Sequence, residues 1–327
     1  MKGSGPLAWL LYVAVRLLLA IMQVFPINWN LRTARLFTRI WIRLMPRHRD
    51  RAVAHLTAAL GNQYPSERLR QIAIQCLESA AMFTIELVCL PRLVNAFTWT
   101  RYINLVNFDE AIRLAVTGRG LILVTAHYGS FEVIGHLLAT LGFDVVAIMR
   151  PVDNDYLNRY IVEARRTHGL SLINKKGATA QAEDVLSRGA LLGFIGDQDA
   201  GRKGCFVDFF GQPASTYKAI ALLAMTTRTP VVVGYVRRRN GTAQYDVGIE
   251  RILRPEEWEQ QADPMQWISQ AYSAAIESFV RAAPEQYWWM HRRWKSQPRR
   301  VAKVQARRLD EPIPPVQTQV DQVRPAI

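Results

Sequence analysis

The stretch LILVTAHYGSFEVIGH, residues 121–136, joins a strand to a helix and carries an imidazole and a carboxylate at the junction. The run LILVT (121–125) has the length and aliphatic character of a buried strand, and Ser130 is a suitable N-cap for a helix that follows. Two residues five positions apart on one helix point about 140° apart, so His127 and Glu132 can meet only if His127 precedes the helix. We therefore predict that His127 lies just beyond the carboxyl end of a strand, where open α/β sheets place their ligands.

Short aliphatic runs alternate with amphipathic segments along the rest of the chain. The aliphatic runs predict buried strands at 121–125, 145–149, 191–196 and 231–235, with a further strand at 244–250. The intervening segments predict helices at 131–141, 155–168, 177–188 and 215–227, and a long helix begins at Ser66. This alternation is typical of an α/β fold with a mostly parallel central sheet flanked by helices.

The N-terminus carries a hydrophobic run of 19 residues, LAWLLYVAVRLLLAIMQVF (7–25), whose only charged residue is Arg16. It is long enough to cross a hydrocarbon core, and no small-residue cleavage site follows it. We therefore predict that residues 1–27 are an uncleaved membrane anchor helix. An arginine near the centre of a spanning helix costs about 2.5–3.5 kcal/mol, so a helix lying in the membrane interface is an alternative. A buried core helix of a soluble protein is another.

Basic residues are concentrated near the two ends of the chain, which has a net charge of +14. Residues 2–51 contain nine Lys or Arg and one acid, and residues 292–308 contain eight and none. A charge confined to two segments predicts an anionic partner, either nucleic acid or a membrane surface. The arginines between residues 32 and 43 recur every three or four positions among apolar residues, which predicts an amphipathic basic helix on the anionic inner leaflet. No nucleic-acid-binding signature is present, and the positive-inside rule places the body of the protein in the cytoplasm.

The three cysteines, Cys76, Cys89 and Cys205, lie far apart and form no CxxC pair. This spacing argues against a disulfide scaffold and against a zinc ribbon. It is consistent with a reducing compartment.

An imidazole beside an ionised carboxylate is the pairing expected of a general base. Glu132, in the first turn of a helix, would stay ionised near the positive end of the helix dipole. It would then fix the tautomer of His127 and stabilise the imidazolium. A structural histidine and a surface glutamate are the alternative, since HxxxxE alone is a weak pattern. The HExxH, GxSxG and GxxxxGK[ST] motifs are absent, and we predict no metal and no cofactor.

Four segments together resemble the late lipid A acyltransferases of Gram-negative bacteria, the lauroyl and myristoyl transferases. They are HYGSFE (127–132), MRPVDNDYLNRYIVEARRTHG (149–169), GDQDAGRKGCFVDFFGQPAST (196–216) and PEQYWWMHRRWK (284–295). The resemblance covers roughly residues 5–297 in the same order. Mycobacterial phosphatidylinositol mannoside acyltransferase resembles a relative of these enzymes within the same superfamily.

The resemblance implies a glycerolipid acyltransferase-like fold and an O-acyltransferase. Such an enzyme moves a fatty acyl chain from an acyl carrier protein or coenzyme A thioester to a hydroxyl of a membrane glycolipid, such as a lipid A precursor. A thioester already has a good leaving group, so the main task of such an enzyme is to deprotonate the acceptor alcohol. The acyl transfer then needs no enzyme nucleophile. The resemblance also implies His127 as catalytic base with Glu132 as its relay. It implies substrate binding by Arg150, Asp197, Gln198 and Asp199.

We accordingly expect an anchor over 1–27, an acyltransferase domain over 28–298 and a disordered basic tail over 299–327, at the cytoplasmic side of the inner membrane. The alternatives are a phosphatidylinositol mannoside-type or other glycerolipid acyltransferase that uses acyl-CoA, a hydrolase, and a non-catalytic lipid-binding protein. The segment YWWMHRRW (287–294) predicts either a headgroup interface or a core cluster. Arg292, Arg293 and Lys295 are a candidate docking face for the acidic carrier protein.

Overall fold

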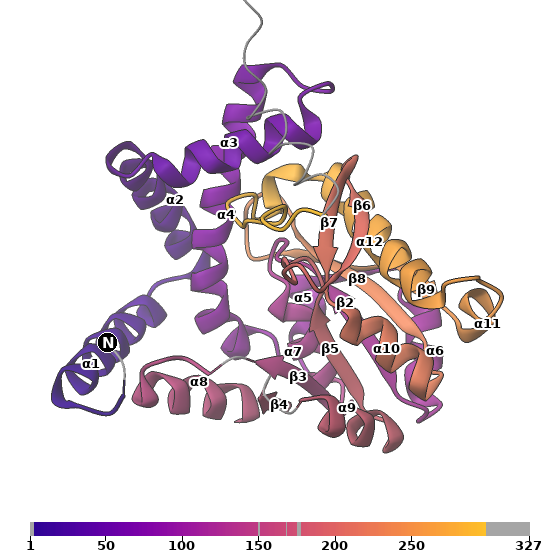
Figure 1. Ribbon diagram of the computed structural model, residues 1–327. Coiled ribbons are helices and arrows are strands. Elements are labelled where there is room, and N and C mark those ends of the chain that lie inside the picture. The colour runs from indigo at the N-terminus through magenta and orange to yellow at the C-terminus, as the bar shows by residue number, and fades with distance from the viewer. Residues whose placement is uncertain (1–2, 150, 168, 175–177, 299–327) are drawn as a thin grey trace, which may run out of the picture.

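A seven-stranded sheet forms the centre of the molecule in a computed structural model that describes residues 3–149, 151–167, 169–174 and 178–298 (Figure 1). The strand order is β1-β9-β8-β2-β5-β3-β4, and every neighbouring pair is parallel except β8 with β9. The predicted fold class, a mostly parallel α/β sheet flanked by helices, is therefore confirmed. The strands are β1 (Ile103–Val106), β2 (Leu121–Thr125), β3 (Val145–Met149), β4 (Leu170–Asn174), β5 (Leu191–Ile195), β8 (Val231–Arg238) and β9 (Tyr245–Leu253).

Five elements differ from the predicted pattern. The two outermost strands, β1 and β4, are not predicted, because each is short and only partly buried. A hairpin of β6 (Cys205–Phe209) and β7 (Gln212–Thr216) follows the sheet strand β5. The predicted helix 215–227 is wrong at its start, because residues 215–216 complete β7 and helix α10 (Lys218–Thr227) begins after them.

Helices cover both faces of the sheet (Figure 1). Along β2 the side chains alternate between two hydrophobic clusters: Ile122 and Val124 belong to one, and Leu121 belongs to the other. This alternation is why the strand sequence is aliphatic at consecutive positions. From residue 99 onward the helices are α5 (Trp99–Tyr102), α6 (Asp109–Val116), α7 (Glu132–Thr140), α8 (Asp155–Thr167), α9 (Ala178–Ser187), α10, α11 (Pro255–Trp258) and α12 (Pro264–Ala282), followed by the 3₁₀ turn η1 (Pro284–Gln286).

The first four helices are α1 (Pro6–Val24), α2 (Ile27–Leu44), α3 (Arg47–Leu60) and α4 (Ser66–Leu93). Both α1 and α4 are long and apolar enough to cross a membrane. Helix α4 is largely buried and packs against α2, α3 and η1, as a core helix does, whereas α1 is almost wholly exposed. An apolar N-terminal helix is thus present where the anchor is predicted. The boundaries of the predicted domains stay a prediction, and the tail 299–327 lies outside the described residues.

Candidate active site

His127 and Asp197 lie close together because each follows the end of one of two adjacent strands by the same number of residues. Strands β2 and β5 are parallel neighbours, with Thr125 in register with Ile195. His127 and Asp197 each lie two residues further on, at the same carboxyl edge of the sheet. The Nδ1 of His127 lies 2.8 Å from Asp197 Oδ1, and the His127 main-chain N–H donates to Oδ2 at 3.1 Å. Both residues are buried.

The carboxyl group of Asp197 is ionised at neutral pH. Burial acts to raise its pKa, but the charge and hydrogen bonds of His127, together with the charge of His291, outweigh burial and lower the pKa to about 2. The buried anion is therefore stabilised by the hydrogen bonds that it accepts from His127. An ionised carboxylate at Nδ1 makes this nitrogen the proton-bearing one, since it is the donor in the pair.

The opposite nitrogen of His127, Nε2, is available to accept a proton. The Gln198 side-chain nitrogen lies 3.4 Å from Nε2, which is the geometry of a weak donor facing an acceptor. With Nδ1–H directed at Asp197, the neutral ring presents a basic lone pair at Nε2. This is the arrangement of a general base with an orienting carboxylate.

His291 stands against the ring of His127, with 4.5 Å between the ring centroids. Burial, with a smaller contribution from the charge of His127, lowers the pKa of His291 to about 4. His291 is therefore neutral at physiological pH and does not oppose a positive charge on His127. Atoms of His127, Asp197 and His291 lie within 4.8 Å of one another, a spacing that can hold a metal ion. Both Asp197 oxygens already accept hydrogen bonds from His127, which fits a proton relay; the expectation of no metal stays a prediction.

Aromatic rings enclose the imidazole. Trp288 lies 5.2 Å from the His127 ring, and Phe131 lies at the same distance. Phe83 on α4 stacks on Phe131 at 4.4 Å. The indole N–H of Trp288 is buried and has no hydrogen-bond partner among the described residues. The site thus combines a shielded base with an unused donor beside it.

Glu132 lies in the first turn of α7, as predicted, but its side chain is paired outside the His127 loop. It forms an ion pair with Arg165 of α8, while Asp197 holds Nδ1 of His127. The physical reason is the start of α7: the helix begins at Glu132 itself, so this side chain leaves its first turn toward α8. The hydrogen-bond partner of His127 Nδ1 is thus Asp197, and the relay role predicted for Glu132 stays a prediction. Asp197, predicted to bind substrate, contacts His127, and its part in substrate binding also stays a prediction.

The loop that carries His127 is held by the chain that follows η1. The carbonyl of Gln286 accepts a hydrogen bond from Gly129 N–H at 2.9 Å, and Trp288 N–H donates to the His127 carbonyl at 3.0 Å. Gly129 has a φ of +53°, and a Cβ there would lie 1.9 Å from the Val236 carbonyl oxygen. Only glycine fits this position. The sequence carries no local signal for this pairing, because about 160 residues separate the two segments.

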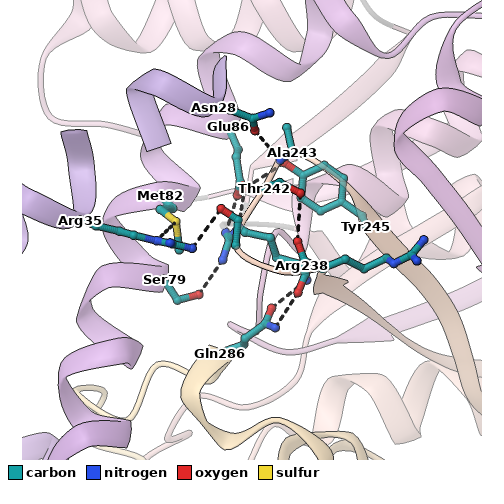
Figure 2. Close-up of polar contacts among 12 residues, drawn as sticks. Asn28, Arg35, Ser79, Met82, Glu86, Arg238, Thr242, Ala243, Tyr245 and Gln286 are labelled. Atoms are coloured by element: carbon teal, nitrogen blue, oxygen red, sulfur yellow. Dashed lines mark hydrogen bonds and ion pairs between the residues drawn. The ribbon is translucent and has the colours of Figure 1, made fainter. Parts of the chain in front are cut away.

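Gln286 is fixed in turn by a buried polar network (Figure 2). Its side-chain amide exchanges two hydrogen bonds with the main chain of Arg238, at 2.8 and 2.9 Å. The Arg238 guanidinium forms two bonds with the carboxylate of Glu86, at 2.5 and 2.6 Å, and donates to Ser79. Tyr245 also donates to Glu86. Helix α4, strands β8 and β9 and the turn η1 are thereby joined behind the active site.

The remaining predicted site residues take different positions relative to His127. Asp199 accepts hydrogen bonds from Gly201 N–H and from the main chain and hydroxyl of Ser296, so it ties the loop to the end of the domain. Gln198 lies beside His127 as described. Arg150 lies outside the described residues.

The segment 287–294 is mainly a core element, which decides between its two predicted roles. Tyr287 and Trp289 are buried in the hydrophobic core rather than exposed to headgroups. Arg293 is also buried, and it donates to the Ser215 carbonyl and the Thr216 hydroxyl. Arg293 is therefore wrong as a member of a docking face, because its charge does not reach the surface.

Residues 4–296 match the family model of the bacterial lipid A biosynthesis acyltransferases. The chain belongs to this family. It is 23% identical over 304 residues to the lipid A biosynthesis lauroyltransferase of Escherichia coli, which covers 90% of this chain and 94% of that protein. It is 28% identical over 202 residues to the E. coli lipid A biosynthesis palmitoleoyltransferase, covering 61% and 63%. A lipid A biosynthesis acyltransferase of Haemophilus influenzae is 24% identical over 192 residues, covering 58% of each chain.

The chain is therefore an acyltransferase, as predicted. The prediction of membrane association is supported by the kinship with lipid A enzymes and by the exposed apolar helix α1.

Proposed function

We propose that this acyltransferase moves a fatty acyl chain from a thioester to a hydroxyl of a lipid A precursor, with His127 as general base. The observation that supports this most strongly is the buried pair of His127 and Asp197, which leaves Nε2 free of the carboxylate. The names of the relatives, all lipid A biosynthesis acyltransferases, support the acceptor class.

The reaction needs one base and no covalent enzyme intermediate. Nε2 of His127 removes the proton of the acceptor hydroxyl as its oxygen attacks the thioester carbonyl. Asp197 stabilises the resulting imidazolium through Nδ1. When the tetrahedral intermediate collapses, the C–S bond breaks and the imidazolium returns the proton to the thiolate. The products are the ester and the free thiol, and the base is regenerated.

The oxyanion of this intermediate requires a donor near the base. The buried indole N–H of Trp288, whose ring lies 5.2 Å from the imidazole, is our candidate. Trp288→Phe removes this N–H and keeps most of the ring. Loss of kcat with little change in KM would support the assignment, and unchanged kcat would remove it.

For Glu132 we propose a positioning role rather than a catalytic one. Its ion pair with Arg165 joins the first turn of α7 to α8, directly after the loop that carries His127. Gln198 is our candidate for contact with the acceptor hydroxyl, because its amide already faces Nε2. For Arg150 and Asp199 substrate binding stays a prediction.

The donor and the side of the membrane follow from the same proposal. An acyl carrier protein thioester is the proposed donor, with coenzyme A as the alternative. We place the site at the cytoplasmic face of the inner membrane, with an anionic leaflet as the partner of the basic N-terminal segment. No nucleic acid is part of this proposal.

A direct assay tests the function. The full-length protein is incubated with an acyl carrier protein thioester and a lipid A precursor in mixed micelles, and lipids are analysed by mass spectrometry. His127→Ala should abolish the acylated product, whereas the matched control His48→Ala, on α3, should retain it. Free fatty acid instead of acylated lipid would indicate a hydrolase. Lipid binding without turnover in the parent protein would indicate a non-catalytic lipid-binding module.

A further inference from the structure

The two N-terminal helices expose long apolar faces. On α1 the exposed positions recur with helical spacing, at Leu7, Leu10, Leu11, Leu17, Leu18 and Ile21. On α2 they are Leu36, Phe37, Ile40, Trp41 and Leu44, with Phe37 66% and Leu44 75% exposed. Eleven exposed apolar side chains on two consecutive helices are more than isolated surface hydrophobics.

Although most of α1 is exposed, its first half contacts α8 and the residues before α8. At its start, Gly3 N–H donates to the Asp153 carbonyl at 2.9 Å, and the Asn154 amide donates to the Ala8 carbonyl at 2.9 Å. Further along, the guanidinium of Arg16 lies over the ring of Tyr160, 4.4 Å from its centroid. Figure 1 shows α1 beside α8 at one edge of the molecule.

These contacts are incompatible with a spanning orientation of α1. Residues 6–16 of this helix cover about 15 Å, which is half of a hydrocarbon core about 30 Å thick. If α1 crossed the bilayer while keeping its partners, the start of α8 would lie at the same depth. Helix α8 has the sequence DYLNRYIVEARRT, and charged residues recur along it. Charged side chains are excluded from the hydrocarbon region unless paired or hydrated.

We propose that α1 and α2 lie in the interface of a single membrane leaflet and form one monotopic lipid-binding surface, and that α1 does not cross the bilayer. The apolar residues named above enter the acyl region, and Arg32 and Arg43, both exposed on α2, face the headgroups. The positive charge of this helix selects anionic phospholipids. The proposal deepens the membrane association above and is independent of the chemistry of His127.

Site-specific labelling tests the surface in the full-length protein. The native cysteines Cys76, Cys89 and Cys205 are buried, so an added cysteine can be labelled selectively in the folded state. Leu11→Cys, Leu18→Cys and Leu36→Cys report on the proposed surface, and Val116→Cys, an exposed apolar residue on α6, is the matched control. Each variant carries an NBD fluorophore and is mixed with phosphatidylglycerol–phosphatidylethanolamine vesicles that contain nitroxide lipids.

We expect blue-shifted emission at positions 11, 18 and 36, with stronger quenching by shallow than by deep nitroxides, and no shift at 116. Vesicles of phosphatidylcholine alone should reduce the effect at position 36. Strongest quenching at position 18 by deep nitroxides would overturn the in-plane orientation. A blue shift without lipid quenching would mean that the faces bind a second copy instead, and would also overturn it.

Sidedness gives an independent readout. A membrane-impermeant maleimide is applied to closed vesicles bearing Ser4→Cys or Val116→Cys protein. In the monotopic arrangement both positions lie on the same side and react to the same extent. Reaction of the two from opposite sides would show that α1 spans the bilayer. Catalytic activity of the variants is measured separately, so failure of this proposal and failure of the proposed function are distinguishable.

Discussion

Asp197 accepts hydrogen bonds from both the ring and the main chain of His127, at 2.8 and 3.1 Å. One carboxylate therefore fixes the tautomer of the imidazole and the position of the loop that carries it. Asp197→Asn keeps the size of the side chain but loses the negative charge and allows the wrong tautomer. We expect kcat to fall by about 10²–10⁴, measured as acylated lipid formed per enzyme.

The control for this variant is Asp199→Asn, two residues along the same loop. Asp199 bonds to Gly201 and Ser296 and does not contact the base. It should lose less than about tenfold in kcat, within the range of an indirect effect. Equal losses in the two variants would mean that the loop as a whole, and not the carboxylate on Nδ1, sets the rate.

His291 makes the stability of the folded protein depend on pH. Its pKa is lowered from 6.5 to about 4, chiefly by burial, so the folded state disfavours the charged ring. Above pH 6.5 the ring is neutral in both states and costs nothing. Between pH 6.5 and 4 this histidine is protonated in the unfolded chain but stays neutral in the folded protein. The free energy of unfolding therefore falls as the pH is lowered, by up to about 3 kcal/mol.

The measurement is urea unfolding in a fixed detergent at pH 7.0 and 4.5. The parent protein should lose more stability between these two pH values than His291→Gln does, because glutamine cannot titrate. His48→Gln, which removes a histidine from α3, should retain the loss seen in the parent. The same loss in His291→Gln as in the parent would assign it to other groups.

The strands and the position of His127 could be predicted from the sequence because both depend on local pattern. Aliphatic runs of five residues identify strands buried on both faces, and His127 directly follows one of them. The same pattern could have predicted a site position for Asp197, because Asp197 also lies two residues beyond the end of its strand. What the sequence did not provide was the strand order that makes β2 and β5 neighbours.

The contacts that depend on tertiary structure were beyond sequence reasoning. Glu132 is close to His127 along the chain, but the helix that begins at Glu132 directs its side chain to Arg165. Gln286, Trp288 and His291 reach the site only because the chain returns to it after α12. No spacing rule relates these residues to position 127. The buried cation Arg293 illustrates the same limit, since its sequence environment resembles a basic surface patch.

The ion pair between Glu132 and Arg165 predicts an energetic coupling that a relay with His127 does not. Glu132→Gln and Arg165→Met should each lower activity, and the double variant should be about as slow as the slower single variant. Glu132→Gln combined with Asp197→Asn should instead multiply the two losses, because those residues act in different contacts. The measurement is steady-state kinetics of the parent, the three single variants and the two double variants, which gives the coupling of Glu132 to each partner. Coupling of Glu132 to Asp197 rather than to Arg165 would restore the relay originally predicted.

Substitution of the exposed basic residues after η1 tests whether the donor is an acyl carrier protein thioester or a coenzyme A thioester. Arg292 and Lys295 are exposed, whereas Arg293 between them is buried. Acyl carrier proteins are strongly acidic, so the two exposed cations should speed their encounter with the enzyme. Arg292→Glu with Lys295→Glu should raise KM for an acyl carrier protein thioester about tenfold or more and change KM for the coenzyme A thioester much less.

Ionic strength supplies the control, because screening acts on the same long-range attraction. Raising salt from about 20 to 200 mM should lower kcat/KM for the carrier-protein thioester in the parent protein and have little effect in the charge-reversed variant. A charge reversal at Arg202 and Lys203, which are exposed and precede strand β6, changes the net charge by the same amount and serves as a matched variant. If that second variant shows the same loss of kcat/KM for the carrier-protein thioester, net charge governs the encounter, and Arg292 and Lys295 do not form a specific docking site. If neither variant affects the carrier-protein thioester, docking on these residues is excluded, and the donor contacts a different face of the acyltransferase.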